Sequence, residues 1–192
     1  MERAGLSTRR VAEAGAELAD EVGFDRVTVS DLARRLEVAT PSLYSHVAGS
    51  TGLRTQIALL ALEEMADRSA EALAGRSGRE ALAALGSSYR TYAREHPGRY
   101  AAARLPMDTT TAAASAGPRH AAMTRALLRG YDLTEPDSTH AVRLLGSLFH
   151  GWSSLELAGG FDHSAPDAGT SWERVVDAVD HLLRTWPGEE QR

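Results

Sequence analysis

The stretch from Thr40 to Val47, with the sequence TPSLYSHV, places polar side chains at the spacing of one short helix. Its surface side chains are hydrogen-bond donors and acceptors without fixed charge, namely Thr40, Ser42, Tyr44, Ser45 and His46. Side chains of this kind can contact base edges and phosphates when a short helix enters the major groove of DNA. The stretch therefore predicts a contact with nucleic acid.

A second helix must hold this short helix in place, and the residues just before it supply one. Thr28 with Asp31 forms a capping box that predicts the helix start. Thr40 followed by Pro41 predicts the start of the second helix, with Thr40 supplying the capping hydroxyl. Glu37–Ala39 then forms the turn. The two helices can share a small apolar core made of Leu32, Ala33, Leu36, Val38, Leu43 and Val47.

These two helices carry a family resemblance. The sequence PSLYSHV, preceded by DLARRLEV, is similar to the DNA-binding domain of the tetracycline-repressor (TetR) family, whose recognition helix ends in a T/S-L-Y-x-H-F/V signature. Two residues depart from the family pattern. Glu37 stands where the family usually has Gly, so the turn must either avoid a positive φ or adopt it with strain. Ser50 stands where many members have a Lys that binds a phosphate.

The resemblance implies a role for each matching residue. The predicted DNA-binding residues are Thr28, Ser30, Thr40, Pro41, Ser42, Tyr44, Ser45 and His46. Thr40–Ser42 are expected to lie nearest the base edges, with Ser30 added from the preceding helix. Thr28, Tyr44 and His46 are expected to hold phosphates. Because the recognition helix has no Arg, Asn or Gln, we expect sequence specificity to depend on thymine methyl groups and DNA shape.

The charge balance limits the expected affinity for DNA. The 192-residue chain has a formal net charge of −5, and residues 1–55 hold seven Arg against eight acidic residues, which gives −1. Residues 38–55 contain no acid, and Arg3, Arg9 and Arg10 form a candidate basic arm on charge alone. We expect salt-dependent binding that neutralises about two to four phosphates per subunit.

Composition fits a globular protein and gives no support for catalysis. Hydrophobic residues make up 43% of the chain and charged residues 24%. There is no Cys, which excludes disulfides and thiolate metal sites. The motifs HExxH and GxSxG and Gly-rich phosphate loops are absent, and no two histidines lie three or four residues apart. We therefore predict no enzyme activity, no metal and no cofactor.

The location of the protein is predicted from two further features. No apolar run approaches the ~20 residues needed to span a bilayer. The sequence MERAGLSTRR has no apolar segment behind its charges, so it does not resemble a signal peptide. We expect a cytoplasmic protein with no membrane contact.

The rest of the chain predicts further helices and no strands. Apolar periodicity indicates helices near residues 8–22, 51–73, 119–131 and 137–158, and a capping box of Ser77 with Glu80 opens another helix that runs through Ala93. The family resemblance implies a short helix over residues 99–105. Residues 106–118 are predicted to be a loop, either mobile or an ordinary connection, and a capping box at Thr170 predicts a last helix from there. The predicted fold is all-α with about nine helices. A three-helix bundle containing the helix-turn-helix occupies 1–50, and a larger effector-binding and dimerisation domain occupies 51–192.

The last two helices each carry an apolar stripe and predict a homodimer. Two copies of them would form a four-helix bundle with closed two-fold symmetry, as these helices do in the resembling family. The alternative is that both stripes pack only within one chain. The predicted interface residues are Leu145, Leu148, Trp172, Val175, Val179, Leu182, Leu183 and Trp186.

A ligand cavity is expected in the larger domain because the resemblance implies an effector domain. The segment Phe149–Trp152 resembles the Trp-His-Gly type of C-terminal domain, with Phe149 in place of the Trp. The alternative for these aromatic and Met residues is an ordinary core, and for His150 a hydrogen-bonded core or interface histidine. The candidate pocket residues are Tyr89, Tyr92, His96, Tyr100, Met107, Met123, Phe149 and Trp152.

These features predict a ligand-responsive transcriptional regulator, most simply a repressor that binds a palindromic operator as a homodimer. A small molecule that favours one spacing of the two DNA-binding heads would release the operator, with the helix from Thr51 as the mechanical link. Two alternatives remain open. One is a small-molecule-binding dimer that has lost DNA binding, and the other is a small helical enzyme or cofactor protein.

Overall fold

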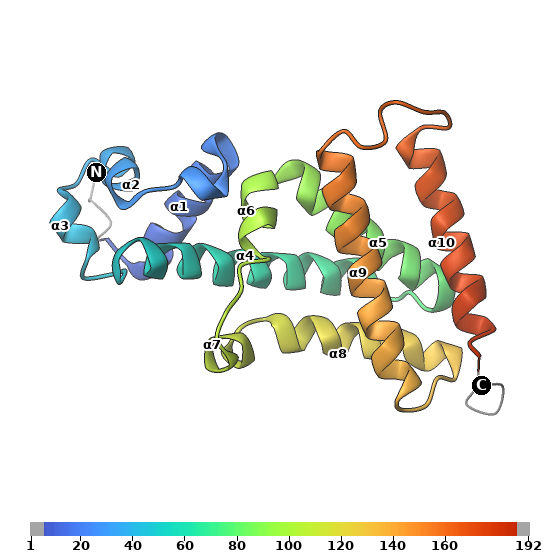
Figure 1. Cartoon of the computed structure of the whole chain (residues 1–192). Coiled ribbons are helices and arrows are strands. Elements are labelled where there is room, and N and C mark those ends of the chain that lie inside the picture. Colours follow the sequence, from blue (N-terminus) through green and yellow to red (C-terminus); the bar gives the residue numbers. More distant parts are fainter. Residues whose placement is uncertain (1–5, 188–192) are drawn as a thin grey trace. The chain divides into compact units, whose positions relative to one another are not determined.

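The structure is a computed structural model of the chain, and it describes residues 6–187. Within these residues the chain forms ten α-helices, two short 3₁₀ helices and no strand (Figure 1). The α-helices are α1 (Thr8–Val22), α2 (Val29–Arg35), α3 (Thr40–Leu43), α4 (Gly49–Leu73), α5 (Gly78–Glu95), α6 (Pro97–Ala102), α7 (Thr109–Ala114), α8 (Gly117–Leu128), α9 (Asp137–Leu157) and α10 (Ala168–Arg184). The 3₁₀ helices are Phe24–Arg26 and Arg129–Tyr131. The predicted all-α fold class is confirmed.

The chain forms two compact units. The N-terminal unit comprises the residues up to Met65 together with Glu95–Gly117. The C-terminal unit comprises Ala66–Arg94 and the residues from Pro118 onward. Helix α4 therefore begins in one unit and ends in the other, and α6 and α7 belong with the first three helices. The division into functional domains at residue 50 stays a prediction.

Helices α1, α2 and α3 pack on the first half of α4 through an apolar core. This core includes the buried side chains of Val11, Leu18, Leu32, Leu43, Leu53 and Ile57. Gly15 of α1 permits a close approach to α4, because a Cβ at this position would lie 2.9 Å from Cδ1 of Ile57. This contact explains a glycine inside a helix, which otherwise costs about 1 kcal/mol relative to Ala.

The turn between α2 and α3 adopts the positive φ that its sequence disfavours. Glu37 has a φ of 54°. Its N–H donates to the carbonyl of Arg34 at 3.2 Å, and the N–H of Val38 donates to the carbonyl of Ala33 at 3.0 Å. This pair of bonds is the Schellman arrangement, which ends a helix with a left-handed residue. Glu37 therefore adopts the positive φ with strain, rather than avoiding it.

Helices α2 and α3 begin differently. Thr28 caps α2 as predicted, because its hydroxyl accepts the N–H of Asp31 at 3.1 Å. The predicted cap at Thr40 is wrong: Ala39 is the cap residue of α3, and no side chain makes a cap hydrogen bond. Thr40 and Pro41 instead form the first turn. Proline has no N–H to satisfy there, which reduces the need for a side-chain cap.

The C-terminal unit is a helical bundle with an aromatic core. Figure 1 shows α9 and α10 side by side, and Trp172 of α10 packs on Phe149 and Trp152 of α9 with ring centroids 6.0 and 5.4 Å apart. Gly86 of α5 makes room for this ring, because a Cβ there would lie 2.6 Å from Trp172. Trp172 is consequently 2% exposed.

One predicted loop contains a helix. Residues 106–118 were expected to lack regular structure, but α7 lies within them. Asp108 caps this helix, since its Oδ1 accepts the N–H groups of Thr110 and Thr111, each at 3.0 Å. The alanines that follow have high helix propensity. The local signals for a helix were therefore present in the sequence.

Helix α10 also begins earlier than predicted. Its first residue is Ala168 rather than Thr170. Asp167 is the cap, and its Oδ1 accepts the N–H groups of Gly169 and Thr170 at 2.8 and 3.0 Å. An Asp two residues before a glycine is as good a cap as the threonine, so the capping pattern alone did not fix the start.

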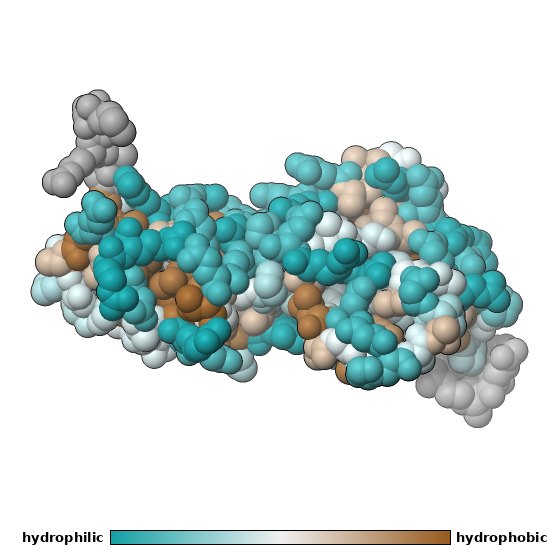
Figure 2. Space-filling model, turned by 90° about the horizontal axis from the view of Figure 1, so that it is seen from above, coloured by the Kyte–Doolittle hydropathy of each residue, from teal (hydrophilic) through white to brown (hydrophobic). Residues whose placement is uncertain are grey.

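In the described part of the chain, no helix combines the length and the hydrophobicity that crossing a membrane requires. Hydrophilic residues cover most of the face shown in Figure 2, and apolar residues are visible there as separate patches.

Candidate DNA-binding surface and ligand pocket

Helix α3 presents its polar side chains to solvent while its apolar side chains anchor it. Leu43 is completely buried and Val47 is 4% exposed, so both fix the helix on the core of the N-terminal unit. Tyr44 is 57% exposed, and Pro41 and Ser42 are also exposed. Thr28, Ser30 and Ser45 are exposed as well, and Thr40 and His46 are half-buried. All eight predicted DNA-binding residues therefore keep accessible surface.

Two of the hydroxyl groups in this set already have partners. Thr28 donates to Oδ2 of Asp31 at 2.6 Å, and this bond lowers the pKa of the Asp31 carboxyl below its usual range. Ser45 donates to the carbonyl of Ser42 at 2.9 Å. Since a hydroxyl has one proton to donate, each must give up its present bond in order to donate to a phosphate. The free donors on this surface are fewer than the sequence indicates.

Arginines of the N-terminal unit pair with carboxylates. Arg9 pairs with Glu13 and Glu63, each at 3.0 Å. Arg54 pairs with Asp25 at 2.7 Å, and its guanidinium lies 4.1 Å from the ring centroid of Phe24. Arg34 and Arg35 also pair with acids. Arg3, the first residue of the predicted basic arm, lies outside the described residues. DNA phosphates must therefore compete with internal partners for most of this charge.

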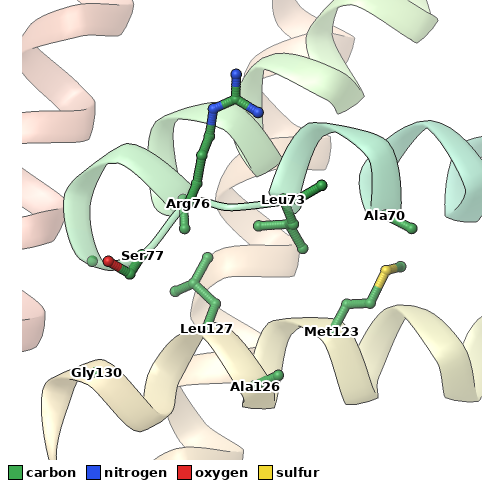
Figure 3. A pocket seen from close by; sticks show the side chains of 11 residues that line it. Ala70, Leu73, Arg76, Ser77, Met123, Ala126, Leu127 and Gly130 are labelled. Carbon is green, nitrogen blue, oxygen red and sulfur yellow. The ribbon is translucent and has the colours of Figure 1, made fainter.

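A pocket of about 410 Å³ lies in the C-terminal unit and is called here the α4–α8 pocket (Figure 3). The end of α4 contributes Ala70, Leu73 and Ala74. Helix α8 and the residues after it contribute Met123, Ala126, Leu127 and Gly130. The turn into α5 contributes Arg76, Ser77, Gly78 and Ala81. Small residues on facing helices leave the space, and its volume lies in the range of small-molecule sites.

The lining of this pocket is almost without charge. Arg76 is the one charged lining residue, and its Nη1 donates to the carbonyl of Ala72 at 2.6 Å while its Nε lies 3.2 Å from Glu80. Figure 3 shows its guanidinium turned away from Leu127 and Met123. The described residues contain no group of three or more His, Cys, Asp and Glu side chains placed to hold a metal ion.

Comparison with known proteins gives the family. Residues 11–46 match the family described as bacterial regulatory proteins of the tetR family, and residues 82–179 match a tetracyclin repressor-like C-terminal domain. An uncharacterized HTH-type transcriptional regulator of Mycobacterium tuberculosis is 32% identical over 98% of this chain and 84% of its own. The chain belongs to the TetR family.

Two further comparisons agree with this assignment. An uncharacterized HTH-type transcriptional regulator of Bacillus subtilis is 28% identical over 96% of this chain and 92% of its own. The structure of a TetR variant from Acinetobacter baumannii in complex with minocycline is 22% identical, covers 96% of this chain and 100% of that one, and gives a TM-score of 0.71. This TetR-family protein is therefore a DNA-binding transcriptional regulator. The Trp-His-Gly subtype of its C-terminal domain stays a prediction.

Three of the predicted pocket residues of this TetR-family chain lie in the N-terminal unit. They are His96, Tyr100 and Met107. His96 Nδ1 lies 3.2 Å from Oδ2 of Asp20 on α1. Tyr100 is completely buried, and Met107 packs against the core beneath the helix-turn-helix. In this arrangement the three side chains stabilise the N-terminal unit, and a ligand contact for any of them stays a prediction.

The other five predicted pocket residues lie in the C-terminal unit. Met123 lines the α4–α8 pocket. Tyr89 packs on Phe149 with ring centroids 5.7 Å apart, and its hydroxyl lies 2.9 Å from Nδ1 of His120. Trp152 packs on Phe161 at 4.6 Å, and Tyr92 is completely buried. Apart from Met123, these side chains make aromatic contacts or are buried, as the alternative of an ordinary core expects.

The predicted interface residues divide by exposure. Four of them have 9% or less of their surface exposed within the single chain, namely Leu145, Trp172, Val179 and Leu183. Leu182 is 40% exposed, and Leu148, Val175 and Trp186 are half-buried. Leu155, which sequence reasoning did not select, is 54% exposed and lies two helical turns after Leu148 on the same face of α9. The exposed members leave an apolar face on α9 and α10.

Proposed function

We propose that this TetR-family protein is a repressor that binds a palindromic operator as a homodimer and is released by a small molecule. The observation that carries the proposal is the exposed polar surface of α3, held in place by the buried side chains of Leu43 and Val47. A short helix anchored this rigidly can place its polar residues in a major groove.

On the DNA side, the first turn of α3 would lie nearest the base edges, with Ser30 beside it. Tyr44 and His46 would hold phosphates and fix the register of the protein on the duplex. The recognition helix has no Arg, Asn or Gln for bidentate base contacts. Specificity would therefore come from contacts with thymine methyl groups and from DNA shape.

A homodimer would present two such helices to half-sites one helical turn, about 34 Å, apart. The exposed apolar face of α9 and α10 supports this assembly. Leu155 and Leu182 would lose their exposed apolar surface in a four-helix bundle built from two copies.

Release by a ligand is supported by the α4–α8 pocket and by the path of α4. A related TetR variant from Acinetobacter baumannii binds minocycline. Helix α4 runs without interruption from Gly49 in the N-terminal unit to Leu73 at the pocket. A molecule that binds more tightly to one position of the end of α4 would shift the population toward one arrangement of the DNA-binding heads.

The test is binding to a fluorescent duplex of the gene's own upstream region, beside a scrambled duplex, at two salt concentrations. The exposed Tyr44 allows a clean variant, because Tyr44→Ala removes a DNA contact without touching the core. We expect tight, salt-dependent binding to the native duplex alone, and a loss of about tenfold in Tyr44→Ala. Tyr44→Phe is the matched control. It keeps the ring and removes only the hydroxyl, so its loss measures the hydroxyl contact, and the further loss in Tyr44→Ala measures the ring contact.

A second candidate function is a small-molecule-binding dimer that no longer binds DNA. The pairing of Arg9 and Arg54 with carboxylates and the presence of Ser50 favour it. Equal, weak binding to the native and scrambled duplexes would contradict an operator in the upstream region. A genome-wide selection of bound fragments would then separate an operator elsewhere from a protein without one.

A further inference from the structure

The walls of the α4–α8 pocket are mostly apolar. They are formed by Ala and Leu of α4 and by Met123, Ala126 and Leu127 of α8. Burying an ionised group against such walls is costly unless an opposite charge or several hydrogen bonds compensate it. The nature of the polar groups at the rim therefore decides which ligands can bind.

Arg76 does not provide a free positive charge for the pocket. Its guanidinium is held by the carbonyl of Ala72 and by Glu80, at 2.6 and 3.2 Å. Figure 3 shows the Arg76 side chain running from the backbone away from Leu127, with the guanidinium at the far end. A carboxylate or phosphate in the pocket would have to replace the contact with Glu80, and a cationic ligand would meet no acidic lining residue.

The remaining polar side chain is Ser77, which lines the pocket and is exposed. A hydroxyl can donate one hydrogen bond and accept others, which suits one neutral polar group on the ligand. The volume of about 410 Å³ lies in the range of small-molecule sites.

We propose that the α4–α8 pocket binds a neutral, largely apolar small molecule with at most one hydrogen-bonding group, placed near Ser77. The inference rests on the proposed function in that this molecule is the effector that releases DNA. Bound between the end of α4 and α8, the ligand moves the last turns of α4 away from Leu127. An ionised group placed against the apolar walls would find no free charge there to compensate it, so a neutral molecule binds more tightly.

The experiment uses two fluorescent probes that share one skeleton. N-phenyl-1-naphthylamine is neutral, and 1-anilinonaphthalene-8-sulfonate adds a sulfonate to the same two ring systems. In titrations of the full chain we expect saturable binding of the neutral probe and at least about tenfold weaker binding of the anionic one. Anionic binding of equal or greater strength that depends on the same pocket would overturn the proposed ligand class.

The site itself is tested by filling it. Ala126→Phe places a ring in the pocket, whereas Ala122→Phe places the same ring one turn earlier on α8, outside the residues that line it. We expect Ala126→Phe to raise the dissociation constant of the neutral probe at least about tenfold. Ala122→Phe should change this dissociation constant by less than about twofold. Ala74→Leu, on the opposite wall, is the second filling variant if Ala126→Phe does not fold. Unchanged probe binding in a folded filling variant would overturn the site.

The same samples separate this inference from the proposed function. Binding to the upstream duplex without probe reports DNA recognition, and binding with probe reports release. If wild-type protein fails to bind the duplex without probe, the proposed function fails and the probe titration still decides the site. If the probe binds the pocket but does not reduce duplex binding, the role of this pocket as the effector site is overturned.

Discussion

Glu37 stores backbone strain in the turn that orients the recognition helix. Its φ of 54° lies in the left-handed region, which costs a residue with a Cβ about 1–2 kcal/mol. Glycine removes this cost but loses about 0.5–1 kcal/mol through its greater freedom in the unfolded chain. We therefore expect Glu37→Gly to raise the free energy of unfolding by about 0.5–1 kcal/mol, measured by chemical denaturation followed by circular dichroism.

The control for this prediction is Glu37→Ala, which removes the carboxylate and keeps the Cβ. The exposed Glu37 side chain changes in both variants, and only the glycine relieves the strained φ. Equal stabilisation by Ala and Gly would show that the loss of negative charge, rather than the backbone, is responsible.

At the residue scale, the sequence predicts a side chain's partner where that partner lies within a few residues along the chain. The cap at Thr28 depends on Asp31, three residues away, and was predicted. The partners of Arg54 and Arg9 include Asp25 and Glu63, which lie 29 and 54 residues away in the sequence. Such pairs depend on how α1 and the 3₁₀ helix Phe24–Arg26 pack against α4, so the free charge of the DNA-binding surface could not be predicted from composition.

At the scale of elements, a bidentate ion pair joins α5 to α9. Arg90 donates from Nε and Nη2 to the two oxygens of Glu156, both at 2.6 Å, and each side chain is 16% exposed. These hydrogen bonds lower the pKa of Glu156 below its ordinary value of 4.5 and raise the pKa of Arg90. The stabilisation is therefore complete above the pKa of the unfolded Glu and is lost as pH falls through the lowered folded pKa.

Glu156→Gln should remove this acid-sensitive stabilisation. At neutral pH we expect a loss of about 1–2 kcal/mol in the free energy of unfolding, because a charged hydrogen-bonded pair is replaced by a weaker neutral one. The difference from wild type should shrink below the ordinary pKa of Glu. Urea denaturation across a pH series measures both effects through the fluorescence of the three tryptophans, Trp152, Trp172 and Trp186.

The matched control for the ion pair is Glu173→Gln on α10. Glu173 lies 3.9 Å from Arg79 and is 70% exposed, so solvent screens its contact. We expect its loss to stay below about 0.5 kcal/mol. A difference between Glu156→Gln and wild type that does not change with pH would contradict an electrostatic origin.

The sequence predicts where the helices lie along the chain better than it predicts which helices pack against each other. Apolar periodicity gave α1, α4 and α9 nearly to the residue, since each buries a regular stripe. Yet α6 packs on α1, where a Cβ on Gly98 would overlap the carbonyl of Ala19 and the backbone N–H of Arg99 donates to Asp20 at 2.9 Å. This packing places α6 in the N-terminal unit. A glycine with no positive φ gives no local sign of such a contact, so the composition of the two units could not be inferred.

Of the eight predicted ligand residues, only Met123 lines the α4–α8 pocket. Aromatic side chains such as Tyr92 and Trp172 fill space and become fully buried, whereas a hollow forms where facing helices carry small residues. Ala70, Ala74 and Ala126 are three such positions. Choosing pocket residues from the sequence by their large size and polarity therefore picks side chains that fill a cavity. It misses the small residues that leave a cavity open.

At the scale of the whole molecule, the remaining apolar surface on α9 and α10 distinguishes a monomer from a dimer. Leu155 on α9 and Leu182 on α10 are 54% and 40% exposed in the single chain. Gly151 lies one turn before Leu155, and a Cβ there would have no atom within 4 Å. A partner helix could therefore approach this face closely. Leu145 and Leu183 are buried inside the single chain, so they do not contribute to this exposed face.

Leu155→Glu is the whole-molecule test of the proposed dimer. In a four-helix bundle this side chain would be buried against the partner, where an unpaired carboxylate is costly. We therefore expect the dimer dissociation constant, measured by analytical ultracentrifugation, to rise at least about 100-fold. Affinity for a two-half-site duplex should fall in parallel, because each free subunit would bind only one half-site.

Leu157→Glu is the matched control, because Leu157 is 41% exposed, belongs to the same helix and points about half a turn away from Leu155. The same charge is added there without entering the proposed interface, so the dimer should persist. If both variants stay dimeric, the interface lies on another face. If both dissociate, added negative charge weakens assembly wherever it is placed. Only dissociation of Leu155→Glu alone places the two-fold axis beside the apolar face of α9 and α10.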